Sequence, residues 1–205
     1  MKNKTYYIAL YGIMFAAIFV AMMLDRLISL ALPISTAACV LLITFSFCFI
    51  KNDWLIGFFS GLFFGVASLI KGIIFNAVAV PIYFAPLLYI VPRLFVGIGA
   101  FAVYKLFLII LKDVNNQTVK QVISLVLGTL IGLCINTVLY LLALNGIKLY
   151  MGEEYTALFT TIKIVIFTNI LPEYLISLIF VPILVLRTRV ALHLGIEGRV
   201  AKIEE

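Results

Sequence analysis

Apolar residues run nearly unbroken, for about the length of a membrane span, at six places in this chain. A helix needs roughly 20 predominantly apolar residues to cross a bilayer, and within the bilayer its backbone hydrogen bonds must be satisfied internally. Hydrophobic residues make up 65% of the 205 residues and charged residues only 12%, far outside the range of a soluble domain. The sequence therefore predicts an all-α integral membrane protein.

We predict one membrane domain, residues 1–205, containing six transmembrane helices. Between the third and fourth helices, residues 72–85 are apolar but interrupted by Asn76 and Pro81. We expect a partly buried loop or re-entrant piece there, because irregular backbone at membrane depth is tolerated where protein covers it. The first helix is expected to be retained in the mature protein. The predicted spans are residues 6–24, 36–50, 54–70, 86–111, 119–144 and 161–186.

Lysine and arginine residues are distributed unevenly between the two predicted sides of the membrane. If the N-terminus is inside, ten of them lie on the inner side and five on the outer side. The positive-inside rule then places both termini in the cytoplasm. Topology also accounts for the net charge of +6, so no nucleic-acid partner is indicated. The five outer residues are Arg26, Lys71, Arg93, Lys148 and Lys163.

Small residues recur at intervals of four on several predicted spans. Gly57, Gly61 and Gly65 form one such ridge and Gly128 with Gly132 another, and these favour close packing between helices of the same chain. The first span has a similar face, which could pack internally or dock a partner subunit. Its residues are Gly12, Ala16, Ala17 and Ala21.

Three polar side chains fall in the outer half to the middle of the last three spans: Arg93, Asn136 and Glu173. Such residues cost at least about 2.5 kcal/mol at mid-span when charged, and they usually face a cavity or one another. Each has a second polar residue four positions away, and residues four apart share a helix face. If the three faces converge, they line one outward-facing pocket. The pairs are Tyr89 with Arg93, Asn136 with Tyr140, and Asn169 with Glu173.

The role of these residues has two compatible interpretations. Arg93 and Glu173 could form an ion pair that only holds helices together, since buried ions pair by default. The same pair could also contact a ligand. Pro92 and Pro172 precede the two charged residues, and a proline inside a helix frees a carbonyl group and permits a kink.

The sequence lacks the motifs of several chemistries. It contains no G-x-x-x-x-G-K-[ST] nucleotide loop and no G-x-S-x-G, and His193 is its one histidine. The cysteines, Cys39, Cys48 and Cys134, all lie in apolar runs without a C-x-x-C spacing, so no metal site is indicated. We therefore expect a ligand-binding membrane protein without a cofactor rather than an enzyme.

Three stretches carry a resemblance to a known family: "ALYGIMFAAIFVAMMLDR", "FAPLLYIVPRLFVGIGAFAVYKL" and "FTNILPEYLISLIFVPILV". With six spans in about 200 residues, the chain resembles the substrate-binding S-components of energy-coupling factor (ECF) vitamin transporters. The second and third stretches are similar to the pantothenate- and folate-type branch. The resemblance covers most of the chain in topology, while its motifs are loose.

The resemblance implies a multi-pass protein of the cell membrane that binds a vitamin in an outward pocket. It also implies partners, namely an energising transmembrane subunit with two cytoplasmic ATPase subunits, and the surrounding membrane lipid. In this family a small-residue face on the first helix is the usual docking surface, which here corresponds to Gly12, Ala16, Ala17 and Ala21.

Pantothenate is the vitamin that the polar residues favour, because Arg93 suits a carboxylate and the Tyr and Asn side chains suit hydroxyl and amide groups. Folate, pyridoxine or hydroxymethylpyrimidine, riboflavin and cobalamin remain alternatives, and Tyr83, Phe84 and Tyr155 could stack on a larger aromatic vitamin. Two further hypotheses propose other classes of protein: a structural scaffold, and an intramembrane enzyme that relies on Glu173. The expected binding residues are Asn76, Tyr83, Tyr89, Arg93, Asn136, Tyr140, Asn169 and Glu173.

Overall fold

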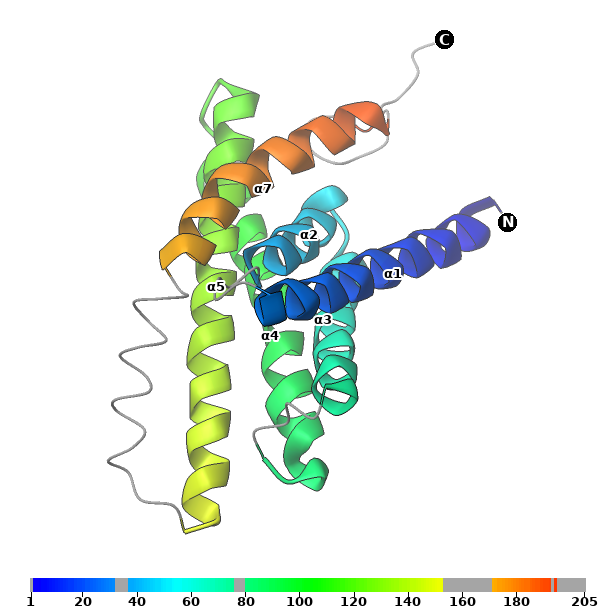
Figure 1. Ribbon diagram of the computed structural model, residues 1–205. Helices are drawn as coiled ribbons and strands as arrows, with labels where there is room; N and C mark the ends of the chain where they lie inside the picture. Colours follow the sequence, from blue (N-terminus) through cyan, green and yellow to red (C-terminus); the bar gives the residue numbers. More distant parts are fainter. Residues whose placement is uncertain (1, 32–36, 76–79, 153–170, 193, 195–205) are drawn as a thin grey trace.

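The computed structural model describes residues 2–31, 37–75, 80–152, 171–192 and 194. The regular elements among these residues are all helices, and Figure 1 shows their order along the chain. They are α1 (Lys2–Ala31), α2 (Ala37–Ile50), α3 (Trp54–Ile74), the short 3₁₀ helix η1 (Ile82–Phe84), α4 (Ala85–Ile110), α5 (Gln117–Tyr150) and α7 (Leu171–Ala191).

Within the described ranges, five helical segments are long and apolar enough to cross a membrane: those of α1, α3, η1 with α4, α5 and α7. The sixth apolar helix, α2, is shorter, with 14 residues, as its short apolar run predicted. The predicted fold class, an all-α membrane protein with several membrane-spanning helices, is confirmed.

Several helix ends lie beyond the predicted span ends. Helix α1 continues to Ala31 rather than residue 24, α5 to Tyr150 rather than residue 144, and α7 to Ala191 rather than residue 186. A span predicted from hydropathy stops at the first charged residues, whereas backbone hydrogen bonding continues the helix through them. The predicted sixth span is described from Leu171 onward, and residues 161–170 lie outside the described part.

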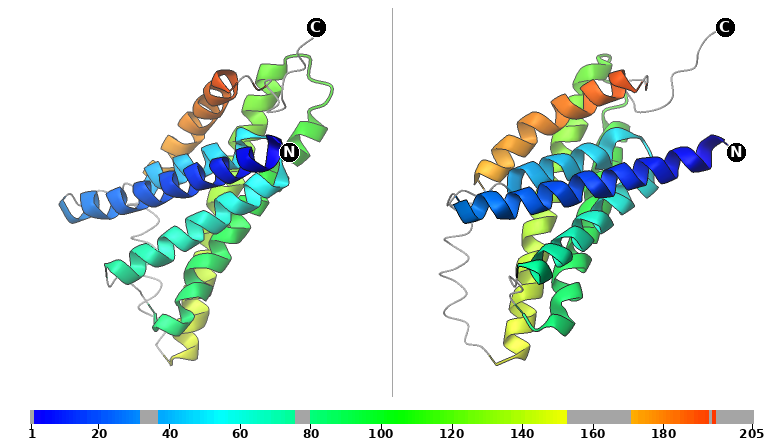
Figure 2. Two further views of the ribbon diagram at one scale, coloured as in Figure 1. Left: turned by 90° about the vertical axis from the view of Figure 1, so that its right-hand side faces the viewer. Right: turned by 45° about the vertical axis from the view of Figure 1, so that its right-hand side comes forward.

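The helices form two groups that cross each other. Helix α4 packs between α3 and α5, while α2 packs against α1, α3 and α7. Figures 1 and 2 show α1, α2 and α7 running across the steeper group of α3, α4 and α5. The apolar core lies where the two groups meet and includes Phe45, Phe49, Phe101 and Tyr104, all fully buried.

Glycines set the distance between α3 and α4. A Cβ atom on Gly61 would lie 2.6 Å from the carbonyl oxygen of Arg93 and 3.0 Å from the backbone nitrogen of Gly97. Real Cβ atoms do not approach other atoms so closely, so only glycine allows this contact. The expected packing role of the Gly57–Gly61–Gly65 ridge within the chain is confirmed.

Arg189 joins the two helix groups at the opposite end from the cavity described below. Arg189 is one of the ten basic residues that the sequence placed on the inner side of the membrane. Its side chain is nevertheless fully buried. It donates hydrogen bonds to the carbonyl oxygens of Phe49 and Ile50, to Gln121 Oε1 at 3.1 Å and to the Tyr104 hydroxyl at 3.0 Å. The first two are among the last carbonyl groups of α2, which have no partner within that helix. Arg189 therefore fixes the C-terminal part of α7 against α2, α4 and α5.

The start of α1 lies on this same side. The hydroxyl group of Tyr7 donates to Asp53 Oδ2 at 3.2 Å, and the Lys51 ammonium nitrogen lies 4.0 Å from the centre of the Tyr6 ring. Residues 51–53 connect α2 to α3. The helix ends that the charge distribution assigned to the inner side are thus gathered at one end of the molecule.

Candidate functional site

A cavity of about 360 Å³ lies at the opposite end of the molecule, where the two helix groups cross. Its volume falls within the range typical of small-molecule sites, about 300–1,000 Å³. Each of the six main helices contributes to its wall. The lining residues are Met22, Asp25 and Arg26 of α1, Val40 and Leu41 of α2, Phe64, Ser68, Lys71 and Gly72 of α3, Tyr89 and Arg93 of α4, Asn136 and Tyr140 of α5, and Glu173 of α7.

The lining residues occupy one half of each helix. They lie toward the C-terminal ends of α1, α3 and α5 and toward the N-terminal ends of α2, α4 and α7. Those are the halves that the sequence analysis assigned to the outer side. The cavity therefore has the depth expected of the predicted outward-facing pocket.

Arg93 is positioned by a local feature of α4. A proline has no N–H group, so Pro92 leaves the carbonyl oxygen of Leu88, four residues earlier, without its helical donor. The Nη1 atom of Arg93 lies 3.4 Å from that oxygen and 3.1 Å from the carbonyl oxygen of Tyr89. The guanidinium group thus takes over part of the backbone bonding that the proline interrupts.

Aromatic rings surround the same guanidinium group. Its carbon atom lies 5.1 Å from the centre of the Phe64 ring, 5.3 Å from that of Tyr89 and 5.4 Å from that of Tyr140. Cation–π attraction at these distances stabilises a charge removed from water. Together with the glycine contact behind the Arg93 backbone, the rings hold the side chain against the cavity wall.

An ion pair links α1 and α3 across the cavity wall. The Nζ atom of Lys71 lies 2.9 Å from Asp25 Oδ2, and the Asp25 side chain is only 8% exposed. Neither residue was among the expected site residues, because both lie near the predicted outer ends of their spans, where charges are ordinary. The sequence did offer one indication that these residues belong to the site. Both lie near the outer side of the membrane, where Arg93 was also placed.

Four polar side chains of the cavity carry a buried atom that has no hydrogen-bond partner among the described residues. Buried polar groups are nearly always satisfied in proteins, and an unsatisfied one costs roughly 1–3 kcal/mol. A cluster of them around one cavity indicates that a bound molecule or water completes the bonding. The atoms are Arg26 Nε, Ser68 Oγ, Arg93 Nε and Asn136 Oδ1.

The structure brings together five of the eight expected binding residues. Tyr83 is not one of them. It is 71% exposed, and its ring contacts that of Phe84 in a tilted arrangement, with 4.6 Å between the ring centres. Asn76 and Asn169 lie outside the described residues. The five that line the cavity are Tyr89, Arg93, Asn136, Tyr140 and Glu173.

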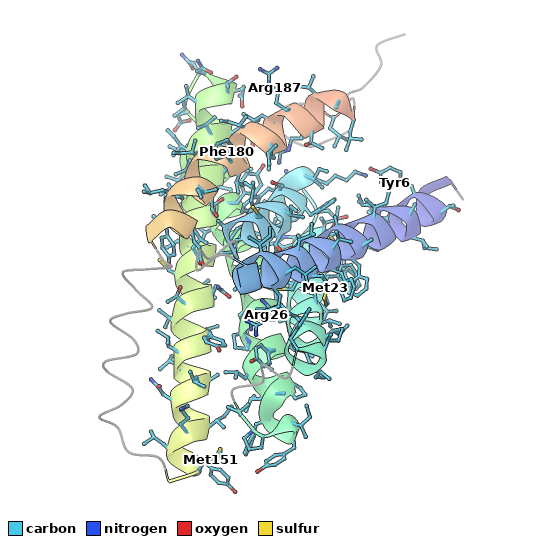
Figure 3. All side chains as sticks on the ribbon, viewed as in Figure 1. Tyr6, Met23, Arg26, Met151, Phe180 and Arg187 are labelled. Carbon is cyan, nitrogen blue, oxygen red and sulfur yellow. The ribbon has the colours of Figure 1, made fainter. Side chains whose placement is uncertain are left out.

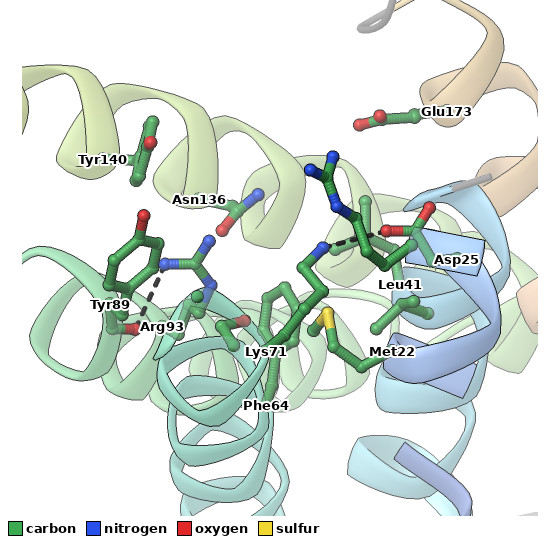
Figure 4. Close-up of a pocket in the computed structure, with 14 residues that line it drawn as sticks. Met22, Asp25, Leu41, Phe64, Lys71, Tyr89, Arg93, Asn136, Tyr140 and Glu173 are labelled. Atoms are coloured by element: carbon green, nitrogen blue, oxygen red, sulfur yellow. Dashed lines mark hydrogen bonds and ion pairs between the residues drawn. The ribbon is translucent and has the colours of Figure 1, made fainter. Parts of the chain in front are cut away.

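The ion pair between Arg93 and Glu173, one of the two arrangements that the sequence left open, is not among those of the described residues. In the described part of the chain, the hydrogen bonds of Arg93 go to carbonyl oxygens of its own helix, and no ion pair joins it to Glu173. Figure 4 shows Glu173 on the side of the cavity near Asp25, with Arg93 and Tyr89 on the other side. The reason is the crossing of the helices, in which α7 packs against α2 and α5 rather than against α4.

The expected docking face on α1 divides into two parts. Gly12 and Ala16 are exposed and Ala17 is half-buried, while Ala21 is only 8% exposed and belongs to the apolar core. Ala21 therefore packs within this chain, contrary to the expectation that it faces a partner. Helix α1 buries the face that bears Ala21, and Gly12 and Ala16 lie on its exposed side.

No protein-family model, curated protein or solved structure matches this chain. The described residues contain no group of three or more His, Cys, Asp or Glu side chains placed to hold a metal ion.

Proposed function

We propose that this protein is a high-affinity vitamin-binding subunit, an S-component, of an ECF-type importer in the cell membrane, and that pantothenate is its vitamin. In this proposal it captures the vitamin on the outer side and docks on a separate energising transmembrane subunit that carries two ATPases. The lack of a nucleotide loop in the sequence is compatible with a subunit that is energised by others.

The observation that carries the proposal is the set of buried, unsatisfied polar atoms around one cavity of about 360 Å³. A scaffold protein gains nothing from leaving such atoms unpaired, because each costs free energy. A binding protein does gain, because the ligand supplies the missing partners. The aromatic rings around Arg93 keep its charge in place while the site is empty.

The donors and acceptors suit pantothenate, which has a carboxylate, an amide and two hydroxyl groups. Arg93 suits the carboxylate, since a guanidinium group can bind one through two parallel hydrogen bonds. Asn136 and Tyr140 suit the amide and hydroxyl groups. The cavity volume lies near the lower end of the range for small-molecule sites, which favours a compact vitamin over folate or cobalamin.

We propose that the energising subunit docks on Gly12 and Ala16, the exposed small residues of α1. A close approach of a partner helix requires small residues at the contact, and nothing lies within 4 Å of a Cβ atom placed on Gly12. Ala17, half-buried, lies at the edge of this surface.

The test is to purify the protein, denature it and identify any released small molecule by mass spectrometry, followed by calorimetric titration of ligand-free protein with pantothenate. Release of pantothenate and a submicromolar dissociation constant would support the proposal. The matched control is Arg93→Ala, which removes the central donor. If the protein releases no small molecule and pantothenate produces no heat of binding, the proposed function is wrong and a scaffold role is favoured.

A further inference from the structure

The cavity is lined by a second, half-buried arginine, Arg26, which the sequence analysis did not assign to the site. Arg26 extends from the C-terminal part of α1 toward the end of α3, where its guanidinium carbon lies 5.9 Å from the centre of the Phe75 ring. Its Nε atom is buried and has no hydrogen-bond partner among the described residues. The neighbouring carboxylate, that of Asp25, pairs with Lys71 at 2.9 Å.

The two arginines belong to different walls of the cavity, Arg26 to α1 and Arg93 to α4. Arg93 lies with Tyr89 and Tyr140 on one side, and Asp25, the neighbour of Arg26 in α1, lies on the other. A ligand that satisfies both Nε atoms must therefore extend across the cavity. It must also carry a hydrogen-bond acceptor at each end, because a guanidinium group only donates.

The charges on the two sides differ. The cavity is lined by three cationic side chains, Arg26, Lys71 and Arg93, and by two carboxylates, Asp25 and Glu173. If all five are ionised, their sum is +1, and a ligand with one negative charge brings the site to neutrality, as burial of charge requires. Both carboxylates lie on the side away from Arg93, where Lys71 is paired with Asp25, so the excess positive charge lies at Arg93.

We infer that Arg26 is a second ligand-binding residue and that the ligand carries one negative charge at the Arg93 end and a neutral acceptor at the Arg26 end. The neutral acceptor is a hydroxyl or carbonyl oxygen. The inference rests on the proposed function in that the cavity holds a small polar ligand. It goes further in assigning Arg26 and in selecting against doubly charged ligands.

Pantothenate and pantothenol provide a pair of probes, since pantothenol has a hydroxymethyl group in place of the carboxylate. Calorimetric titration would be carried out with the parent protein, Arg26→Met and Arg93→Met. Arg93→Met should weaken pantothenate binding about thirtyfold or more and leave pantothenol binding nearly unchanged. The substitution removes the guanidinium group and pantothenol lacks the carboxylate, so each removes the same interaction. Arg26→Met should weaken the binding of both probes by about tenfold, because it removes a contact at the other end.

Two results would overturn the inference. One is unchanged affinity of Arg26→Met for both probes, and the other is an effect of Arg26→Met on pantothenate alone, which would mean that Arg26 binds the carboxylate. If Arg26→Met does not fold, Arg26→Lys keeps the positive charge but lacks the Nε donor, and it should weaken the binding of both probes. Arg187→Met, an exposed arginine outside the cavity, is the matched control and should bind as the parent does.

If the parent protein does not bind pantothenate, the proposed vitamin is wrong, but Arg26 can still be tested. The small molecules released on denaturation of the parent protein and of Arg26→Met would then be compared by mass spectrometry. A singly charged species present in the parent and depleted in Arg26→Met supports the inference. Equal contents, or a doubly charged ligand, overturn it, and a parent protein that releases nothing overturns both the inference and the proposed function.

Discussion

The guanidinium group of Arg93 lies 3.4 Å from the carbonyl oxygen of Leu88, the acceptor that Pro92 leaves without a helical donor. Pro92 and Arg93 are adjacent in the sequence, and each supplies a hydrogen-bonding group that the other lacks within the membrane. The proline exposes a carbonyl group that the helix cannot satisfy, and the arginine needs acceptors in a region without water. The remaining Nε donor is left facing the cavity without a partner among the described residues.

Replacing Pro92 with alanine tests this relationship. The new N–H group can bond to the Leu88 carbonyl oxygen, so the free energy of unfolding should rise or stay the same. Arg93 then loses one acceptor and its orientation is less fixed, so the affinity for pantothenate should fall about tenfold. Thermal unfolding in detergent and calorimetric titration measure the two effects. An unchanged affinity would show that Pro92 has no part in positioning Arg93.

Arg93 itself should be irreplaceable by lysine. Arg93→Ala should lose roughly 2–5 kcal/mol of binding free energy, because a desolvated charged partner is removed. Arg93→Lys should also bind weakly, since an ammonium group cannot reproduce the two parallel hydrogen bonds to a carboxylate. Lys112→Ala, at an exposed position beyond the end of α4, should bind as the parent does. Parent-like affinity of a folded Arg93→Ala protein would contradict the proposed binding role.

The glycine contact between α3 and α4 predicts a large difference between two similar substitutions. Gly61→Ala places a Cβ atom 2.6 Å from the Arg93 carbonyl oxygen, so the helices must separate, at a cost of about 1–3 kcal/mol. Gly146→Ala, in α5, has nothing within 4 Å of the new atom and should leave the melting temperature unchanged or slightly raised. Thermal unfolding of the two variants side by side measures this. Equal melting temperatures would mean that α3 and α4 do not approach as closely as described.

Arg189 predicts a similar contrast with its near neighbour Arg187. Arg189→Met should destabilise the protein by about 3 kcal/mol or more, because it leaves the Phe49 and Ile50 carbonyl groups and Gln121 without a charged donor. Arg187 is exposed, and Arg187→Met should cost less than about 0.5 kcal/mol. Chemical unfolding of both variants in the same detergent compares them. Comparable stability would show that the buried network contributes little.

The two parts of the α1 small-residue face should respond differently to a bulky side chain. Ala16→Trp should abolish vitamin uptake by cells yet leave binding to the purified protein intact, because Ala16 is exposed in this chain. Ala21→Trp should reduce expression and binding together, since Ala21 lies in the core. Uptake assays and calorimetry of the same variants separate the two outcomes. Normal uptake with Ala16→Trp would rule out docking through this surface.

The sequence was sufficient to find five of the fourteen residues that line the cavity. Tyr89, Arg93, Asn136, Tyr140 and Glu173 stood out because polar residues are rare within apolar runs and because four of them form pairs spaced by four along a helix. Those signals are local, and the structure places all five around one cavity.

The rest of the site could not be predicted because it depends on how the helices cross. Arg26 and Lys71 lay near predicted span ends, where basic residues usually reflect topology. Whether such a residue faces water or a cavity depends on the length and tilt of its helix, which hydropathy does not specify. Because hydropathy does not specify how helices cross, it also could not show that Arg93 and Glu173 lie apart or that Arg189 is buried.

Helix α7 contributes both Glu173 to the cavity and Arg189 to the buried network at the other end. A protein chain emerges from the ribosome from its N-terminus, so α7 is the last of the described helices to be made. Until α7 is in place, the last carbonyl groups of α2 and the side-chain amide of Gln121 lack their charged donor, Arg189. The cavity therefore gains its last wall in the same step that completes the buried network around Arg189. A chain that stops before this helix would lack both one wall of the cavity and the donor for these carbonyl groups.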